Sequence, residues 1–126
     1  MMGGRWREAE QRFNERRRRE DEALRLLEKV PRLRSLKLEI EEHRGVSTLA
    51  ETKHTRVVIV ERAPALFVVP CGDRDCRDGG HDVTDAVLRA LLAGEERFEV
   101  EDGCVGNIRS AECGRTVRIV AKATYA

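Results

Sequence analysis

The chain has 126 residues, of which 40% are hydrophobic, 4% aromatic and 37% charged, and its formal net charge is +1. A charge so close to zero excludes a global basic field that would attract nucleic acid. This length predicts a single globular unit. Its few apolar residues can form only a modest core, which a metal ion or dimerisation would stabilise further.

The start of the chain and its apolar content predict a cytoplasmic protein without membrane contact. Residues 1–8 lack the apolar stretch of a secretory signal, and no apolar run approaches the roughly 18 residues of a transmembrane helix. In the reducing cytoplasm, clustered cysteines bind metal more often than they form disulfides. The 20 arginines against 4 lysines suggest a GC-rich bacterial genome.

Residues 5–30 predict one long helix, because they contain no Gly or Pro and consist mostly of strong helix formers, and Pro31 ends the run. Polar Glu10, Arg17 and Glu20 interrupt its heptad seam, which makes an independent coiled coil poor. We expect this helix either to form a homodimer or bind a protein partner, or to lie solvated with its last two turns on the core. The predicted division is residues 1–31 as a long charged helix for oligomerisation or partner contact, and residues 32–126 as an α+β zinc-binding domain.

Four consecutive arginines, Arg16–Arg19, raise nucleic-acid binding as an alternative. Glu15 and Glu20 flank them, and such mixed charge is typical of a solvated helix face with i,i+4 ion pairs. A nucleic-acid adaptor therefore remains an alternative and not the favoured function. It would also use the arginines near the cysteines, which are Arg74, Arg77, Arg109 and Arg115.

After Pro31 the apolar period changes to two, which predicts strands. Leu36, Leu38 and Ile40 alternate with charged residues, and a second strand with two apolar faces at its end, typical of a central strand, should complete an antiparallel hairpin. The predicted fold is α+β, a long N-terminal helix followed by a small antiparallel sheet in the order β-β-β-α-β-β. The strands are expected over residues 36–40, 55–60, 65–69, 98–101 and 117–125, with a helix over residues 83–93 after the third.

All four cysteines lie between Pro70 and Gly114, as Cys71-x4-Cys76, a gap of 27 residues, and Cys104-x8-Cys113. Zinc prefers four thiolate or imidazole ligands in a tetrahedron, and two cysteine-bearing loops can supply them. The predicted helix between the pairs would return the chain so that the loops meet. The arrangement broadly resembles zinc-ribbon and zinc-knuckle modules, with looser spacings than their usual C-x2-C. We therefore predict a structural zinc site.

Several alternatives remain at this site. His81 could replace one cysteine as a ligand, or could support the ligands or cap the following helix. The cysteines could instead form disulfides or stay as free thiols, and metal release with disulfide formation would make a thiol redox switch. Cys76 and His81 could form a nucleophile pair, but paired cysteines favour a closed, non-catalytic site. The sequence thus predicts a non-enzymatic zinc-stabilised interaction module.

Overall fold

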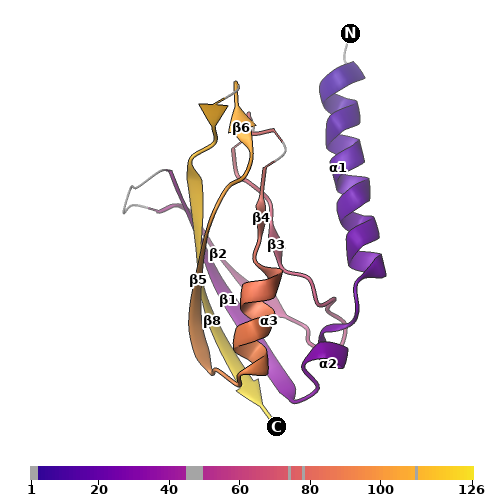
Figure 1. The fold of residues 1–126 in the computed structure, drawn as a ribbon, viewed down its shortest axis with the longest axis vertical. Coiled ribbons are helices and arrows are strands. Elements are labelled where there is room, and N and C mark those ends of the chain that lie inside the picture. Colours follow the sequence, from indigo (N-terminus) through magenta and orange to yellow (C-terminus); the bar gives the residue numbers. More distant parts are fainter. Residues whose placement is uncertain (1–2, 45–49, 74, 78, 110) are drawn as a thin grey trace.

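The computed structural model describes residues 3–44, 50–73, 75–77, 79–109 and 111–126. Its main feature is a four-stranded antiparallel sheet with strand order β2-β1-β8-β5 (Figure 1). The strands are β1 (Leu33–Arg44), β2 (Ala50–Val58), β5 (Arg97–Gly103) and β8 (Arg115–Tyr125). β8 comes last along the chain but lies in the middle of the sheet.

One face of the sheet is packed and the other faces solvent, as Figure 1 shows with the sheet on edge. The alternation that predicted β1 is confirmed, because Leu36, Leu38 and Ile40 are buried and the residues between them are exposed. Helix α3 (Thr84–Leu92) supplies Val87 and Leu91 to the same core. The outward face of the sheet is rich in Lys, Arg and Glu, consistent with a solvated antiparallel sheet.

The antiparallel hairpin of β1 and β2 is confirmed, with Leu36 opposite Val58. The prediction that the second strand is central is wrong, because β2 lies at the edge of the sheet. Val57 is 72% exposed and Ile59 60% exposed, while Val58 and Val60 turn to the core. Apolar residues on both faces of this strand therefore do not mean that both faces are covered.

Two short strand pairs extend from the sheet toward the cysteines. The predicted strand over residues 65–69 is reduced to β3 (Val68–Val69), which pairs with β4 (His81–Asp82). The tip of the β5–β8 connection contains β6 (Asn107–Ile108) and β7 (Ala111–Glu112). These pairs frame the two cysteine loops.

The prediction of one helix over residues 5–30 is wrong. Helix α1 spans Gly3–Glu22, the chain then leaves the helix, and a single turn, α2, spans Leu26–Lys29. The break follows from backbone pairing with residues 63–65. Leu26 N–H donates to the Ala63 carbonyl at 2.9 Å, and the Leu24 carbonyl accepts from Ala65 N–H at 2.6 Å.

The predicted fold class is corrected accordingly, because antiparallel sheet dominates the molecule and its helices are shorter than expected. The expectation that the end of the helical segment packs on the core is confirmed by Leu26 and Val30, which are 0% and 3% exposed. None of the helices in the described residues combines the length and apolar character needed to cross a bilayer.

Candidate metal centre

The structure brings all four cysteines together. Their sulfur atoms lie within 4.8 Å of one another, and the pairs Cys71–Cys113 and Cys76–Cys104 are each 3.6 Å apart. Tetrahedral zinc with Zn–S bonds of about 2.3 Å separates its sulfurs by about 3.8 Å. The spacing is therefore compatible with a structural metal held by four thiolates.

The sheet positions each ligand. Cys71 and Cys76 lie on the loop between β3 and β4. Cys104 directly follows β5, and Gly114 alone separates Cys113 from the start of β8. The two loops are joined by reciprocal backbone hydrogen bonds between Arg77 and Asn107, of 2.8 and 3.0 Å. The antiparallel pairing of β5 with β8 brings the two ends of the second loop close together.

Two glycines make this close approach possible. A Cβ at Gly79 would lie 2.2 Å from Cys76 Sγ and 2.7 Å from Cys104 Sγ. A Cβ at Gly106 would lie 2.4 Å from Cys76 Sγ and 2.5 Å from the Gly79 Cα. All four distances are far below van der Waals contact, so only glycine fits where the loops meet.

Backbone donors favour an ionised sulfur at Cys104. The N–H groups of Gly80 and Gly106 donate to its Sγ at 3.3 and 3.4 Å. Burial raises the pKa of this thiol, but these donors, together with hydrogen bonds from the Cys76 and Cys71 thiols, outweigh burial and the pKa of Cys104 is lowered. Burial raises the pKa of Cys71 to about 11 and that of Cys76 further, so both are protonated at neutral pH without a metal.

A buried ion pair beneath the site was missed by the sequence reasoning. Glu42 and Arg115 are 4% and 5% exposed, and the Arg115 Nε–H donates to Glu42 Oε1. Both carboxylate oxygens of Glu42 also accept from Gly72 N–H, at 3.1 Å each. The Arg115 carbonyl accepts from Cys104 N–H at 2.8 Å. The two residues of the pair thus fasten both cysteine loops to the sheet, Glu42 through its side chain and Arg115 through its main chain.

The sequence contains a signal for this pair. Glu42 continues the period-two series of Leu36, Leu38 and Ile40, which places a carboxylate on the buried face. Arg115 was named in the sequence analysis as one of the arginines that a nucleic-acid adaptor would use. It instead pairs with Glu42 and Glu51. Arg74, another arginine of that set, lies outside the described residues.

His81 lies in β4 and is fully buried. Its Nδ1 is 3.2 Å from Asp102 Oδ2, and its Nε2 has no hydrogen-bond partner among the described residues. The group of mutually close ligand atoms in the described part of the chain consists of the four cysteines without His81. The carboxylate of Asp102 therefore orients the ring.

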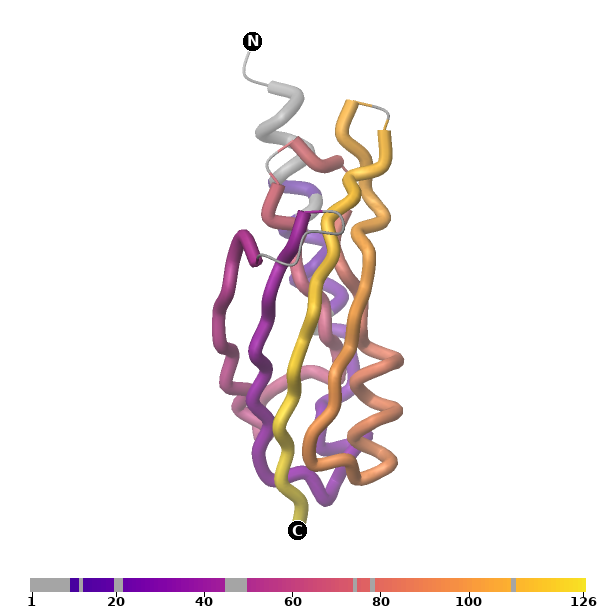
Figure 2. Tube along the Cα trace, turned by 90° about the vertical axis from the view of Figure 1, so that its left-hand side faces the viewer, coloured from indigo at the N-terminus to yellow at the C-terminus, as the bar shows by residue number. Residues whose placement is uncertain are grey.

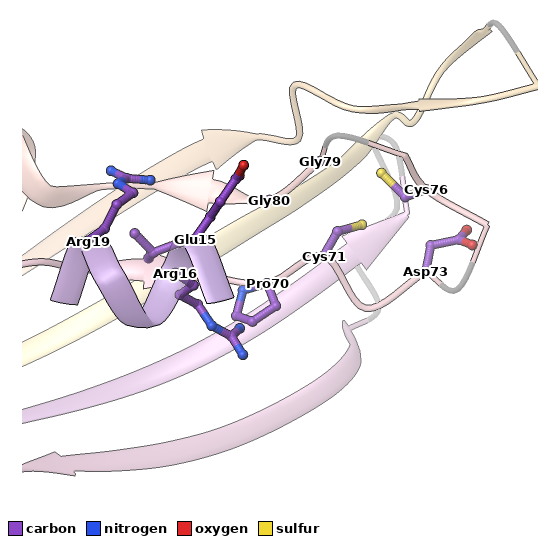
Figure 3. A pocket seen from close by; sticks show the side chains of 10 residues that line it. Glu15, Arg16, Arg19, Pro70, Cys71, Asp73, Cys76, Gly79 and Gly80 are labelled. Atoms are coloured by element: carbon purple, nitrogen blue, oxygen red, sulfur yellow. The ribbon is translucent and has the colours of Figure 1, made fainter. Parts of the chain in front are cut away.

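A cavity of about 460 Å³ lies between α1 and the loop that carries Cys71 and Cys76. Figure 3 shows the α1 side chains at one end of this cavity and the two sulfurs toward the other. Arg19 of α1 pairs with Asp82 at 2.9 Å, which ties the helix to β4. One side of the cysteine cluster therefore borders an open space. The helix residues that line it are Glu15, Arg16 and Arg19.

Comparisons with protein-family models, curated proteins and solved structures find no match to this chain.

Proposed function

We propose that this protein is a non-enzymatic interaction module stabilised by one structural zinc ion on Cys71, Cys76, Cys104 and Cys113. The observation that supports this is the cluster of four sulfurs within 4.8 Å, built from two loops that glycines allow to touch. Four thiolates favour zinc over hard cations such as calcium and magnesium. Because the four sulfurs fill a tetrahedron, they leave no open position for a catalytic water.

Zinc would contribute directly to folding. The ligands come from segments far apart in sequence, so metal binding joins the β3–β4 loop to the end of the β5–β8 hairpin. A reducing compartment, for which we propose the cytoplasm, keeps the thiols available.

The test is elemental analysis of protein purified under reducing conditions, with a thiol count on the same sample. We expect about one zinc per chain and four thiols that react only after unfolding or chelation. A chelator should lower the thermal midpoint. Metal-free protein with four reactive thiols and an unchanged midpoint after zinc addition would rule the proposal out.

For partner contact we propose helix α1. It bears Phe13, which is 49% exposed, and the guanidinium carbons of Arg16 and Arg17 lie 5.8 and 5.9 Å from its ring centroid. An aromatic ring flanked by arginines on an exposed helix suits a protein surface with apolar and acidic groups. Replacement of Phe13 by Ser should weaken binding to an isolated partner without changing zinc content.

A thiol redox switch is a second candidate, favoured by the two sulfur pairs at 3.6 Å. In each pair one thiolate would attack hydrogen peroxide to give a sulfenic acid and hydroxide. The second thiolate would then displace hydroxide from that sulfur to form the disulfide, and one peroxide becomes two waters once protonated.

The geometry predicts the disulfides Cys71–Cys113 and Cys76–Cys104, with release of zinc. Peptide mapping after mild peroxide tests this connectivity. Disulfides within the loops, Cys71–Cys76 or Cys104–Cys113, or irreversible oxidation to sulfinic acids, would contradict the switch.

A further inference from the structure

We propose that copies of this chain associate edge to edge, with the β2 edge of one copy pairing antiparallel with the β5 edge of the next. β2 and β5 are the two end strands of the four-stranded sheet. An edge strand presents backbone N–H and C=O groups that can pair with another strand. This association does not depend on the proposed zinc function.

The two edges carry opposite charge. β2 contains Lys53 and Arg56 and the single acid Glu51, whereas β5 contains Glu99, Glu101 and Asp102 and the single base Arg97. Two β5 strands centred on Val100 would place Glu99 opposite Glu101, and like charges directly opposite are destabilising.

The register within one copy already indicates how the next copy would fit. Lys53 lies opposite Glu41, Glu41 opposite Arg118, and Arg118 opposite Glu101, so charge alternates across the outward face. Lys53 Nζ is 3.2 Å from the Glu41 carboxylate. Lys53 of the next copy, placed beside Glu101, continues this alternation.

The strand directions also agree. Each neighbouring pair in the sheet is antiparallel, so a strand added to β5 must run in the direction of β2. A copy displaced sideways, without being turned over, meets this condition and keeps its outward face on the same side. In this register Thr55 lies opposite Glu99, and Val57, which is 72% exposed, lies beside the aliphatic part of Arg97.

The packed layer behind the sheet is displaced toward β5. Figure 2 looks through the open face of the sheet, and α3 emerges beyond β5 while no helix emerges beyond β2. On β2, His54 and Arg56 point to the packed side, opposite buried Ile40 and Leu38, yet both are exposed. At His54 and Arg56 the inner surface of β2 therefore lacks the cover that the rest of the sheet has.

A groove of about 540 Å³ lies between α3 and β5, where the inner side chains of an added strand would enter. Ala86 and Ala90 on α3 and Ala93 just after it leave room for His54 and Arg56 of the next copy, and acidic residues also line the groove. The lining residues are Ala86, Arg89, Ala90, Ala93, Glu95, Phe98, Glu99, Val100 and Glu101. A second copy thus supplies both the missing cover of β2 and the complementary charge.

Because the two contacting surfaces differ, the association is head to tail, and a copy displaced sideways without rotation leaves both ends open to further copies. Oligomer size should therefore increase with concentration and decrease with salt, which screens the exposed charges. Sedimentation velocity of the full, metal-loaded chain over a concentration series, at low and high salt, measures both dependences.

Charge reversal tests the register. Lys53→Glu or Glu101→Lys should each weaken association about tenfold at low salt, because attraction becomes repulsion. The double variant Lys53→Glu with Glu101→Lys should restore it to within about twofold. Lys122→Glu makes the same charge change on β8 in the middle of the outward face and should leave association unchanged.

A monomer at every concentration would overturn the proposal. So would single variants that associate normally, or a double variant as weak as the singles while it retains the wild-type thermal midpoint. Loss of association on Phe13→Ser, with no effect of the edge charges, would assign self-association to α1 and also overturn it.

Discussion

Replacement of Glu42 by Gln should destabilise the protein substantially. The change keeps the size of the side chain but removes the negative charge that faces Arg115, whose side chain is 6% exposed. Removal of one partner of a buried ion pair costs about 3–5 kcal/mol. Glu51 remains 2.7 Å from the guanidinium, so we expect about 3 kcal/mol, the lower end of that range.

At an unfolding entropy of about 2.1 cal/mol/K per residue, a loss of 3 kcal/mol lowers the thermal midpoint of this 126-residue chain by about 11 °C. One bond from Gly72 N–H to the side chain also becomes less favourable, because an amide offers one acceptor oxygen where the carboxylate offers two. Zinc affinity should fall about 10- to 100-fold, as for other groups that orient metal ligands.

The assay is thermal unfolding by circular dichroism with and without zinc, followed by competition with a chromophoric chelator. Glu39→Gln is the matched control, since Glu39 lies on the same strand with its side chain 49% exposed. It should change the free energy of unfolding by less than about 1 kcal/mol. If the two variants lose the same stability, the buried pair does not fasten the cysteine loops.

Two further predictions concern the metal centre. Gly79→Ala should abolish tight zinc binding, because its Cβ would lie 2.2 Å from Cys76 Sγ. Gly103→Ala should retain zinc binding, because no atom lies within 4 Å of the added Cβ. Equal zinc affinity of the two variants in chelator competition would refute the steric explanation. The metal-free protein should lose stability as pH rises from about 9 toward 11, because the pKa of Cys71 is raised from 9.0 to about 11 and folding favours its protonated form. Urea unfolding at several pH values should show this loss without zinc and not with zinc, where the sulfur is already ionised.

The sequence predicted those parts of the structure that depend on one local pattern, either the period of the apolar residues or the spacing of the cysteines. The alternation of Leu36, Leu38 and Ile40 predicted β1, and the apolar face of residues 83–93 predicted α3. The clustering of the cysteines also followed from spacing alone, since a helix between two loops returns the chain.

The failures came from tertiary contacts that local patterns do not contain. Residues 23–25 have good helix propensity, yet pairing with residues 63–65 takes their backbone groups and ends α1. The apolar end of β2 looked central because Val58 and Val60 do enter the core, but nothing in the strand itself shows that Val57 is exposed. The buried ion pair of Glu42 could not be predicted from the local sequence, because its partner, Arg115, lies 73 residues away on another strand.

The central position of β8 has a consequence for how the chain folds. β1 and β5 are not neighbours in the sheet and are joined only through β8. β1 therefore gains its second neighbouring strand only when β8 pairs with it, which places Ala123 opposite Leu36. The hairpins of β1 with β2 and of β5 with β8 can form early from local contacts, whereas the pairing of β1 with β8 joins distant parts of the chain. The closure of such long loops places the chain among slow-folding topologies, with times on the order of milliseconds to seconds. Until β8 is inserted, one side of β1 remains an open, apolar strand edge, which makes that interval the period of greatest risk for aggregation.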